Sequence, residues 1–425
     1  DPNGGRDTIL VDPDHSEDLI MILVSTGPGD TYLKNIRLLP PGGACSGDPT
    51  LYCEADAACA AESAGTCRLF ADHPDEHRFH PDFLANLEPF EVVRMMDWMR
   101  TVDSDVVDYT TDYTQMDDAH WERAPAQVMA ELANVLDVDL WVNVPHRGNS
   151  TFAADFASAL ASTLEPGRQV FVEFSNEVWN PTFQQYRDVT ADGCAAYSTE
   201  LDCDDPIDEL LARLRQNSDR ARAVWVDFET ALGASRVVKV LAGQTGNTWM
   251  NGYLLDWNGT AAAADVVATA AYFGWTLGDD EAVAGWSPQR LMGELRDVEI
   301  PATIGWMRDD VALLASDPAY AHLQQVYYEG GQHLVAFGDI ETDPNKAALL
   351  AAMNSRFDAA NTSSDMALRY DELLDGWLAD GGGVLLLHYV NVHPQREWGR
   401  FGALEWQGQD PTTSPKYHTL FHYLP

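Results

Sequence analysis

The sequence predicts a (β/α)8 barrel of the TIM-barrel type, an α/β fold, and three observations lead to this prediction. Short runs rich in β-branched and aromatic residues alternate with amphipathic stretches from about residue 36 to residue 390. The 425 residues are enough for one such barrel with enlarged loops. Glycine-rich phosphate-binding motifs do not follow the predicted strands, and this disfavours the rival class, a doubly wound sheet.

Eight strands are expected, and they are named here in chain order. They are Ile36–Leu39, Phe90–Asp97, Leu140–His146, Val170–Ser175, Arg236–Ala242, Ala264–Tyr272, His322–Tyr328 and Val384–Val390. Apolar residues recur with helical spacing in the intervening segments 124–137, 151–164, 207–232, 288–315 and 347–378. This order predicts parallel strands joined by helices that cover the outside of the barrel.

Two further segments are expected outside the regular barrel. Residues 1–37 contain short apolar runs separated by Asp, Pro and Gly, which predicts a β-rich extension resembling a hairpin or the edge of a sandwich. Residues 38–425 form the barrel itself, and a cysteine-rich insertion at about 44–70 interrupts it. We expect this insertion to narrow or to extend the binding cleft.

The six cysteines predict disulfides. Four of them follow the spacing C-x7-C-x5-C-x7-C from Cys45 to Cys67, which lacks the close pairs typical of zinc sites. Cys194 and Cys203 form a second local set. An even number of clustered cysteines is typical of secreted proteins, and the chain begins at Asp1 with no signal peptide. We therefore expect a mature secreted protein, whereas the pairing of the first four cysteines stays open.

The charge of the chain limits its partners. A net charge of −41 disfavours binding to nucleic acid and to anionic membranes, and a neutral glycan fits it better than an acidic one. The charge indicates either adaptation to high salt, which we favour, or a genome that encodes few lysines. The sequence contains no apolar run of membrane-spanning length. We expect a monomer.

Polar residues stand at the ends of several predicted strands, where barrel enzymes place their chemistry. They are Arg94, His146, Asn176, Glu177, Tyr272 and Glu329. Glu177 and Glu329 follow the fourth and the seventh strand, so both carboxyl groups are expected to face one cavity. Tryptophans accompany several strand ends, and their indole rings could stack on sugars. They are Trp98, Trp179, Trp249, Trp275 and Trp398.

These residues resemble those of the clan A glycoside hydrolases, in which Asn-Glu follows strand four and a nucleophilic Glu follows strand seven. The resemblance covers about residues 35–410 and extends to secreted bacterial proteins described as cellulase-like or cellulose-binding. It implies that Glu177 is the general acid/base and Glu329 the nucleophile of a retaining mechanism. It also implies that Asn176 binds the sugar 2-hydroxyl group, and that His146 and Tyr272 orient the nucleophile and the sugar.

Elementary electrostatics agrees with these roles. A retaining mechanism needs two carboxyl groups about 5–5.5 Å apart, one protonated and one ionised. Arg94 beside Glu329 is expected to lower the pKa of that carboxyl group, and an apolar flank such as Trp179 is expected to raise the pKa of Glu177. We therefore expect Trp179, Trp275 and Trp398 to bind substrate together with Arg94.

Each assignment has a structural alternative. Glu177 could be a carboxylate at a helix N-terminus, Glu329 could belong to a turn, and Arg94 could simply pair with a buried Glu173. Glu173 lies on the same face of its strand as Glu177, about 13 Å deeper, so it is expected to be a support for the site. His146 and Tyr272 could likewise be structural.

The sequence thus predicts a secreted retaining glycoside hydrolase, an endo-acting enzyme on a neutral β-glycan such as cellulose or xylan, without a cofactor. The alternatives are a carbohydrate-binding barrel without catalysis and a metal-dependent hydrolase, for which His146, His388 and His393 are the candidate ligands. Acidic loops such as Asp202–Asp208 could hold a structural Ca²⁺, although solvated loops are the better interpretation.

Overall fold

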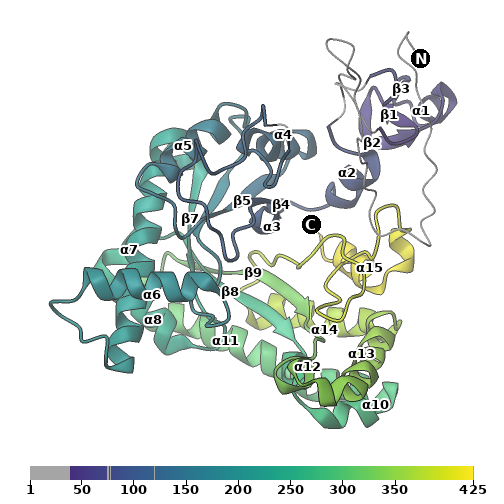
Figure 1. Ribbon diagram of the computed structural model, residues 1–425. Coiled ribbons are helices and arrows are strands. Elements are labelled where there is room, and N and C mark those ends of the chain that lie inside the picture. Colours follow the sequence, from purple (N-terminus) through teal and green to yellow (C-terminus); the bar gives the residue numbers. More distant parts are fainter. Residues whose placement is uncertain (1–38, 74–75, 77, 119, 425) are drawn as a thin grey trace, which may run out of the picture.

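The computed structural model describes residues 39–73, 76, 78–118 and 120–424. Its centre is a parallel sheet with the strand order β4-β5-β6-β7-β8-β9, which curves into a nearly closed α/β barrel (Figure 1). The strands are β4 (Val92–Arg94), β5 (Asp139–Val144), β6 (Val170–Phe174), β7 (Val237–Ala242), β8 (Val266–Phe273) and β9 (Gln324–Gln332). Neighbours in the sheet are consecutive in the chain, as the barrel prediction requires.

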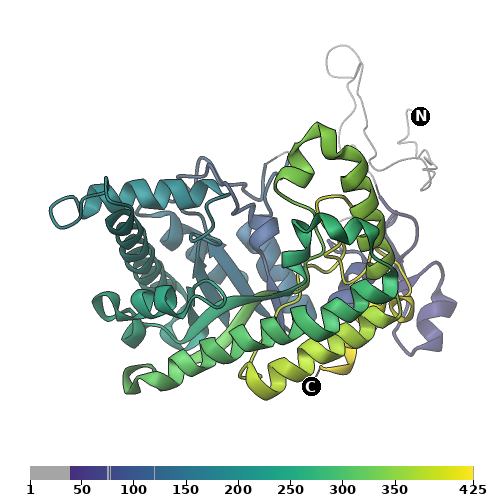
Figure 2. The same cartoon turned by 90° about the horizontal axis from the view of Figure 1, so that it is seen from below.

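Helices surround the strands, as the view from below shows (Figure 2). The longer helices that follow the strands are α4 (Ala126–Leu136), α5 (Phe152–Ala161), α6 (Gln184–Ala196), α7 (Pro206–Leu232), α8 (Thr248–Asp256), α11 (Ile300–Ser316), α13 (Ala347–Asn361), α14 (Asp365–Asp380) and α15 (Pro415–His422). Shorter helices are α3 (Met96–Met99), α9 (Thr260–Ala263), α10 (Pro288–Glu294) and α12 (Asp339–Thr342). A π-helical turn at Leu295–Glu299 joins α10 to α11.

The strands are buried on both faces because helices cover the outside and side chains fill the inside. Trp141, Val240, Ala268, Val326 and Tyr328 belong to the cluster that fills the barrel interior. A second, larger cluster packs the helices against the outer faces of β5 and β6. Burial on both sides explains why these strands read as nearly continuous apolar runs in the sequence.

The outer two predicted strands differ from the prediction. Val384–Val390 forms no regular strand, but Leu386 makes a parallel bridge to Tyr327 and thereby extends the sheet beyond β9. The expected strand Ile36–Leu39 and the expected β-rich extension 1–37 fall outside the described residues, except Leu39. The strand predicted at 322–328 continues to Gln332, so Glu329 lies within β9 and not after it.

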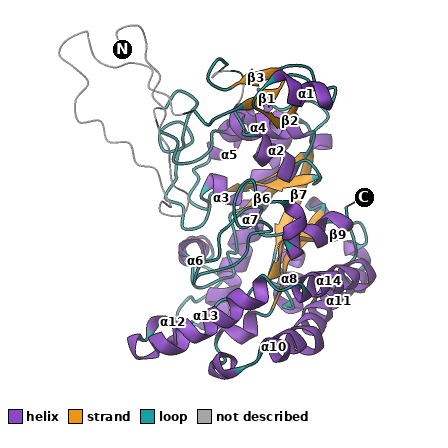
Figure 3. Ribbon diagram, turned by 90° about the vertical axis from the view of Figure 1, so that its right-hand side faces the viewer, coloured by secondary structure: helices purple, strands orange, loops and turns teal. Residues whose placement is uncertain are grey.

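The cysteine-rich insertion folds into a small module. Its three antiparallel strands β1 (Gly43–Cys45), β2 (Asp48–Cys53) and β3 (Cys67–Leu69) accompany the short helix α1 (Asp56–Ala61). Disulfides join Cys45 to Cys59 and Cys53 to Cys67. The module packs on α2 (Pro81–Leu87), away from α10, α12 and α13 (Figure 3).

A third disulfide, between Cys194 and Cys203, ties the end of α6 to the loop before α7. In the described part of the chain, no helix is both long enough and apolar enough to cross a membrane.

Lys416 is a buried charge that we expect to destabilise the fold. Its side chain is 2% exposed, and its Nζ donates a hydrogen bond to the Arg400 carbonyl oxygen at 2.7 Å. Burial lowers the pKa of Lys416 to about 7, although the charge of Glu405 acts in the opposite direction. An unfolded lysine titrates near 10.4, so folding opposes protonation between these two pH values and the destabilisation is largest at and below pH 7.

Lys416→Met is therefore expected to raise the melting temperature, by about 2 °C or more at pH 6 and by less at pH 9.5. Differential scanning calorimetry at both pH values measures this difference. Lys346→Met, which removes a surface lysine beside Glu281, is the matched control and should show no such gain. An equal or larger gain at pH 9.5 would contradict the explanation.

Candidate active site

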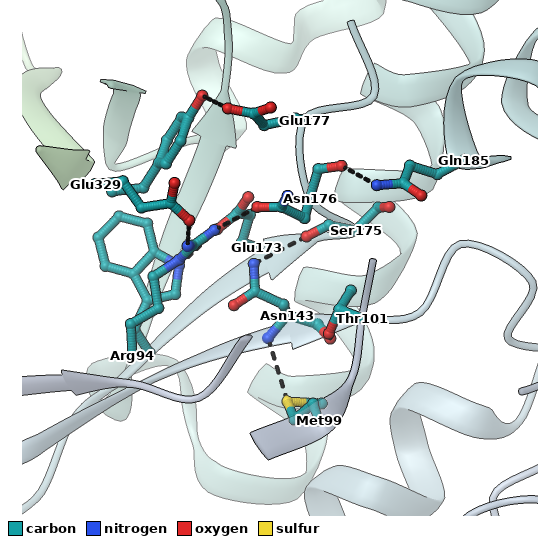
Figure 4. Close-up of polar contacts among 12 residues, drawn as sticks. Arg94, Met99, Thr101, Asn143, Glu173, Ser175, Asn176, Glu177, Gln185 and Glu329 are labelled. Atoms are coloured by element: carbon teal, nitrogen blue, oxygen red, sulfur yellow. Dashed lines mark hydrogen bonds and ion pairs between the residues drawn. The ribbon is translucent and has the colours of Figure 1, made fainter. Parts of the chain in front are cut away.

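Arg94, at the end of β4, is the centre of a buried polar network (Figure 4). Its Nη1 donates to Glu329 Oε1 at 2.6 Å, and its Nη2 donates to Asn176 Oδ1 and to Glu173 Oε2, both at 2.9 Å. Three strands, β4, β6 and β9, thus bring their carboxyl-terminal ends together around one guanidinium group. A planar group with five donors suits such a bridging position better than a lysine would.

A β-bulge in β9 places Glu329. The pairing between β8 and β9 shifts from Thr269–Tyr327 to Ala270–Glu329, so Tyr328 has no partner in the ladder. In a regular strand, consecutive side chains point to opposite faces. The bulge allows both Tyr328, whose ring lies 5.1 Å from the Arg94 guanidinium carbon, and Glu329 to face Arg94.

The turn after β6 places Asn176 and Glu177. Ser175 and Glu177 have positive φ angles of 61° and 44°, an uncommon conformation for residues other than glycine. Side-chain amides hold this backbone: Asn143 Nδ2 donates to the Ser175 carbonyl oxygen at 2.9 Å, and Gln185 Nε2 donates to that of Asn176 at 2.8 Å. The turn aims the Asn176 side chain at Arg94 (Figure 4) and leaves Glu177 beside Tyr328.

Among the described residues, the hydrogen-bond donors to Glu177 are neutral groups. Asn180 Nδ2 donates to its Oε2 at 2.9 Å, and the Tyr328 hydroxyl donates to its Oε1 at 3.3 Å. Burial raises the pKa of Glu177 to about 7, and the nearby charge of Glu329 adds to the increase. This carboxyl group can hold a proton close to neutral pH.

Glu329 has a different set of donors. The Arg94 guanidinium binds one oxygen, and the Tyr272 hydroxyl donates to the other at 2.8 Å. Burial raises the pKa of Glu329, whereas the charge and hydrogen bonds of Arg94 and the hydroxyl of Tyr272 lower it. Arg94 therefore lowers the pKa of Glu329, as the sequence predicted, but burial raises this pKa by more than Arg94 lowers it. A guanidinium at 2.6 Å still makes Glu329 the better anion of the two.

Glu173 lies beneath this pair and is fully buried. It accepts hydrogen bonds from Arg94 and from Trp141 Nε1, the latter at 2.8 Å. Arg94 is therefore at once the ion-pair partner of Glu173, which was one alternative for its role, and the partner of Glu329. Glu173 holds the guanidinium from below, which is a support role.

Other residues predicted to bind substrate lie outside the network. His146 is buried, and its Nε2 lies 2.8 Å from Asp188 of α6. Trp275 follows β8 directly, is 44% exposed and packs against Trp306. Trp398 is 59% exposed in the loop after Val390, close to Arg396.

Trp179 is partly buried and packs against the core near the Tyr328 hydroxyl.

Several residues of the site were not predicted. Tyr328 and Asn180 bind Glu177, and the Tyr389 hydroxyl bonds to Asp97 close to Arg94. Strand alternation places Tyr328 and Glu329 on opposite faces, so no pattern in the sequence reveals the bulge. Asn180 could have been found, since it ends the same Asn-Glu-Val-Trp-Asn segment as Glu177.

Two of the three histidines proposed for a metal site contact other groups. His388 Nε2 lies 2.9 Å from the Tyr370 hydroxyl, and His146 pairs with Asp188. Among the described residues, the one group with metal-ligand spacing is Cys45, Cys53 and Cys59, whose sulfur atoms are in disulfides.

No protein-family model matches the chain, and neither does any curated protein sequence. Among solved structures, it is similar to a GH51 arabinofuranosidase from Xanthomonas axonopodis pv. citri, with 13% identity and a TM-score of 0.43, over 75% of this chain and 62% of that one. It is also similar to a modular endo-β-1,4-mannanase from Cellulomonas fimi, with 9% identity and a TM-score of 0.36, over 80% of this chain and 74% of that one.

Proposed function

We propose that the protein is a retaining glycoside hydrolase that cleaves a β-linked neutral polysaccharide. One observation carries the proposal: two carboxyl groups at the barrel mouth, buried Glu329 and half-buried Glu177, have opposite environments. Glu329 is bound by a guanidinium and a tyrosine hydroxyl, whereas Glu177 has neutral donors and a pKa of about 7. Paired carboxyl groups with separated proton affinities are what double displacement at a sugar carbon requires.

In the first step, a Glu329 oxygen attacks the anomeric carbon as the bond from that carbon to the leaving oxygen breaks. Glu177 gives its proton to the leaving oxygen, and a glycosyl ester on Glu329 results. Arg94 and Tyr272 keep the attacking carboxylate ionised and oriented. Asn176, fixed by Arg94 through its Oδ1, can present its Nδ2 as a donor to the 2-hydroxyl group.

In the second step, water attacks the anomeric carbon and the ester bond breaks. Glu177, now a carboxylate, accepts a proton from that water, so the enzyme returns to its starting state. The anomeric configuration of the product is then the same as that of the substrate. The residues named here complete the cycle without a cofactor.

Charge and disulfides support the wider setting of this proposal. The net charge of −41 would repel an acidic polysaccharide, so a neutral β-glycan such as cellulose or xylan is the proposed substrate, cleaved in an endo fashion. The three disulfides suit secretion, and a monomer is proposed.

Incubation with defined β-linked oligosaccharides, with product anomers followed by proton NMR, tests the function. We expect hydrolysis with retention that survives EDTA at constant ionic strength. Inverted product would exclude the double displacement, and loss of activity in EDTA would favour a metal-dependent hydrolase. Binding without turnover on every glycan would favour the non-catalytic carbohydrate-binding barrel.

The pH dependence follows from the pKa of Glu177. The general acid must be protonated in the free enzyme, so kcat/KM for a substrate with a poor leaving group should fall as pH rises through about 7. An activated aryl glycoside, whose leaving group needs no proton, should show a weaker alkaline fall in its kcat/KM. Identical alkaline limbs for both substrates, measured by initial rates from pH 4 to 9, would contradict the assignment.

Trp398 is proposed to stack on a sugar remote from the bond that is cleaved. Its exposed ring sits in a turn closed by Arg396 and Gly399, and Phe401, two residues after that turn, packs on Tyr272. Trp398→Ala should raise KM for long oligosaccharides by about three- to tenfold, because one aromatic contact contributes about 0.5–1.5 kcal/mol. Trp121→Ala, which removes another exposed indole, is the control and should change no kinetic constant. An unchanged KM in Trp398→Ala would remove the residue from the binding site.

A further inference from the structure

A cavity between β4 and the segment Val384–Val390 has a polar end beside the candidate active site. Its volume is about 460 Å³, and most of its lining is apolar. Polar residues line it where the strands end, among them Asp97, Asn391 and Glu329. Asp97 belongs to α3, which follows β4, and Asn391 directly follows Val384–Val390. These two residues therefore share one cavity with the proposed nucleophile.

Asp97 is accessible to solvent, yet protein surrounds its carboxyl group. The residue is exposed. Desolvation nevertheless raises the pKa of Asp97, whereas the Tyr389 hydroxyl, as a hydrogen-bond donor, and the charge of Arg94 lower it. A carboxyl group on an open surface keeps its contact with bulk water and is not desolvated in this way. The combination of exposure and desolvation is therefore that of a group facing a cavity.

The Asp97 carboxylate has acceptor capacity that the fold does not use. A carboxylate can accept about four hydrogen bonds. Among the described residues, the Tyr389 hydroxyl is the donor that acts on Asp97. Arg94 lies nearby, but its hydrogen bonds go to other acceptors. Within the same part of the chain, Asp97 forms no ion pair and does not cap α3. Its spare acceptors point to a ligand with hydrogen-bond donors.

Asn391 adds a donor and a second acceptor to the same end of the cavity. Its backbone is held in place, because its carbonyl oxygen accepts a hydrogen bond from the Leu404 amide at 2.9 Å and Val392 bridges to Leu404. The residue is partly exposed, and its side-chain amide has no hydrogen-bond partner among the described residues. A ligand with several hydroxyl groups, such as a sugar, can use both Asn391 and Asp97.

The position of the cavity relative to the two glutamates identifies the sugar. In the proposed mechanism, Glu177 gives its proton to the leaving oxygen, so the leaving group lies on the side of Glu177. The described lining of the cavity includes Glu329 but not Glu177. The cavity therefore meets the site on the side of the glycone, the sugar that becomes attached to Glu329.

We propose that Asp97 and Asn391 bind hydroxyl groups of the glycone and thereby select the sugar. The inference rests on the proposed glycosidase function and adds specificity residues to it. Since Asn176 is assigned to the 2-hydroxyl group, the partner of Asp97 is another hydroxyl group of this sugar. A hydrogen bond to an ionised acceptor is about twice as strong as one between neutral groups, so Asp97 makes the larger contribution.

Kinetics with deoxygenated sugars test the proposal. Asp97→Asn keeps the size of the side chain but removes its charge, so kcat/KM for an aryl β-glycoside should fall about 10- to 100-fold. For the monodeoxy glycoside that lacks the partner hydroxyl, kcat/KM of wild type and variant should agree within about twofold, because the bond is absent from both. The 2-deoxy glycoside should stay as sensitive to Asp97→Asn as the parent. Asn391→Ala should show the same selectivity with a smaller fall, about three- to tenfold.

Asp309→Asn is the matched control, because Asp309 is exposed on α11 and does not line the cavity. It should leave kcat/KM unchanged on every substrate. Circular dichroism during heating should show the same fold for all variants. If Asp97→Asn unfolds early, Asp97→Ser repeats the comparison.

Two results would overturn the proposal. Asp97→Asn could leave kcat/KM of the parent glycoside unchanged, or it could reduce kcat/KM equally for the parent and for every deoxy derivative, as a purely structural residue would. If the wild type hydrolyses no glycoside, the proposed function fails separately. Titration calorimetry with the corresponding methyl glycosides then makes the same comparison on Kd, and equal Kd values for wild type and Asp97→Asn, or no binding, would overturn this inference as well.

Discussion

Glu329→Gln is expected to reduce kcat/KM for an aryl β-glycoside by about 10⁴-fold or more. The amide keeps the size of the side chain and can still bind Tyr272, but it cannot form the glycosyl ester. It also removes the negative charge that, after burial, raises the pKa of Glu177. The residual activity should therefore depend on pH with a lower apparent pKa than in the wild type. Initial rates over a pH series measure both effects.

Glu341→Gln in α12 is a suitable control, because Glu341 is an exposed carboxylate and has no part in the network around Arg94. It should leave the rates unchanged. Circular dichroism should show the same fold for both variants. Turnover of Glu329→Gln within a factor of a few of the wild type would mean that Glu329 is not the nucleophile.

Glu177→Ala is expected to separate substrates by their leaving groups. For an unactivated glycoside, kcat/KM should fall by about 10²–10⁴-fold, the usual contribution of general acid catalysis. For a dinitrophenyl glycoside, attack by Glu329 needs no proton donor, so the glycosyl ester should still form. It should then accumulate, because the base that activates water is missing. A burst of dinitrophenol followed by a slow steady rate is the expected signal in stopped-flow absorbance.

Azide provides an internal control for the same variant. A small anion that enters the space left by Glu177 can attack the ester without base assistance and should release a β-glycosyl azide. Equal loss of kcat/KM on both substrates, with neither burst nor azide product, would show that Glu177 acts only through structure.

The strand order and the two carboxyl groups could be predicted because they depend on local patterns. The strands from β4 to β9 are apolar runs bounded by turns. Because these strands are buried on both faces, successive residues must be apolar, and this pattern is visible in the sequence. Val170–Phe174 ends immediately before the Ser-Asn-Glu turn, so Asn176 and Glu177 were placed at the barrel mouth without knowledge of tertiary contacts.

Other features depend on contacts between distant segments, and no local pattern in the sequence predicts these contacts. The bulge at Tyr328 is set by the pairing of β8 with β9. The pairing of Arg94 with Glu173, 79 positions away, could be stated only as an alternative to its pairing with Glu329, whereas the structure shows both. His146 ends its predicted strand like a site residue, yet Asp188 of α6 lies against it. The disulfide pairing of the module also stayed open, because several pairings fit the same spacing.

The central claim, that Glu329 is a covalent nucleophile and Glu177 its acid/base partner, is tested most directly by mass spectrometry. An activated 2-deoxy-2-fluoro-β-glycoside slows hydrolysis of the glycosyl ester, so the ester should accumulate on the intact protein. After peptic digestion, the added glycosyl mass should lie on the peptide that contains Glu329, and Glu329→Gln should remain unlabelled. Labelling of Glu177 or Glu173 instead, or equal labelling of Glu329→Gln, would contradict the account.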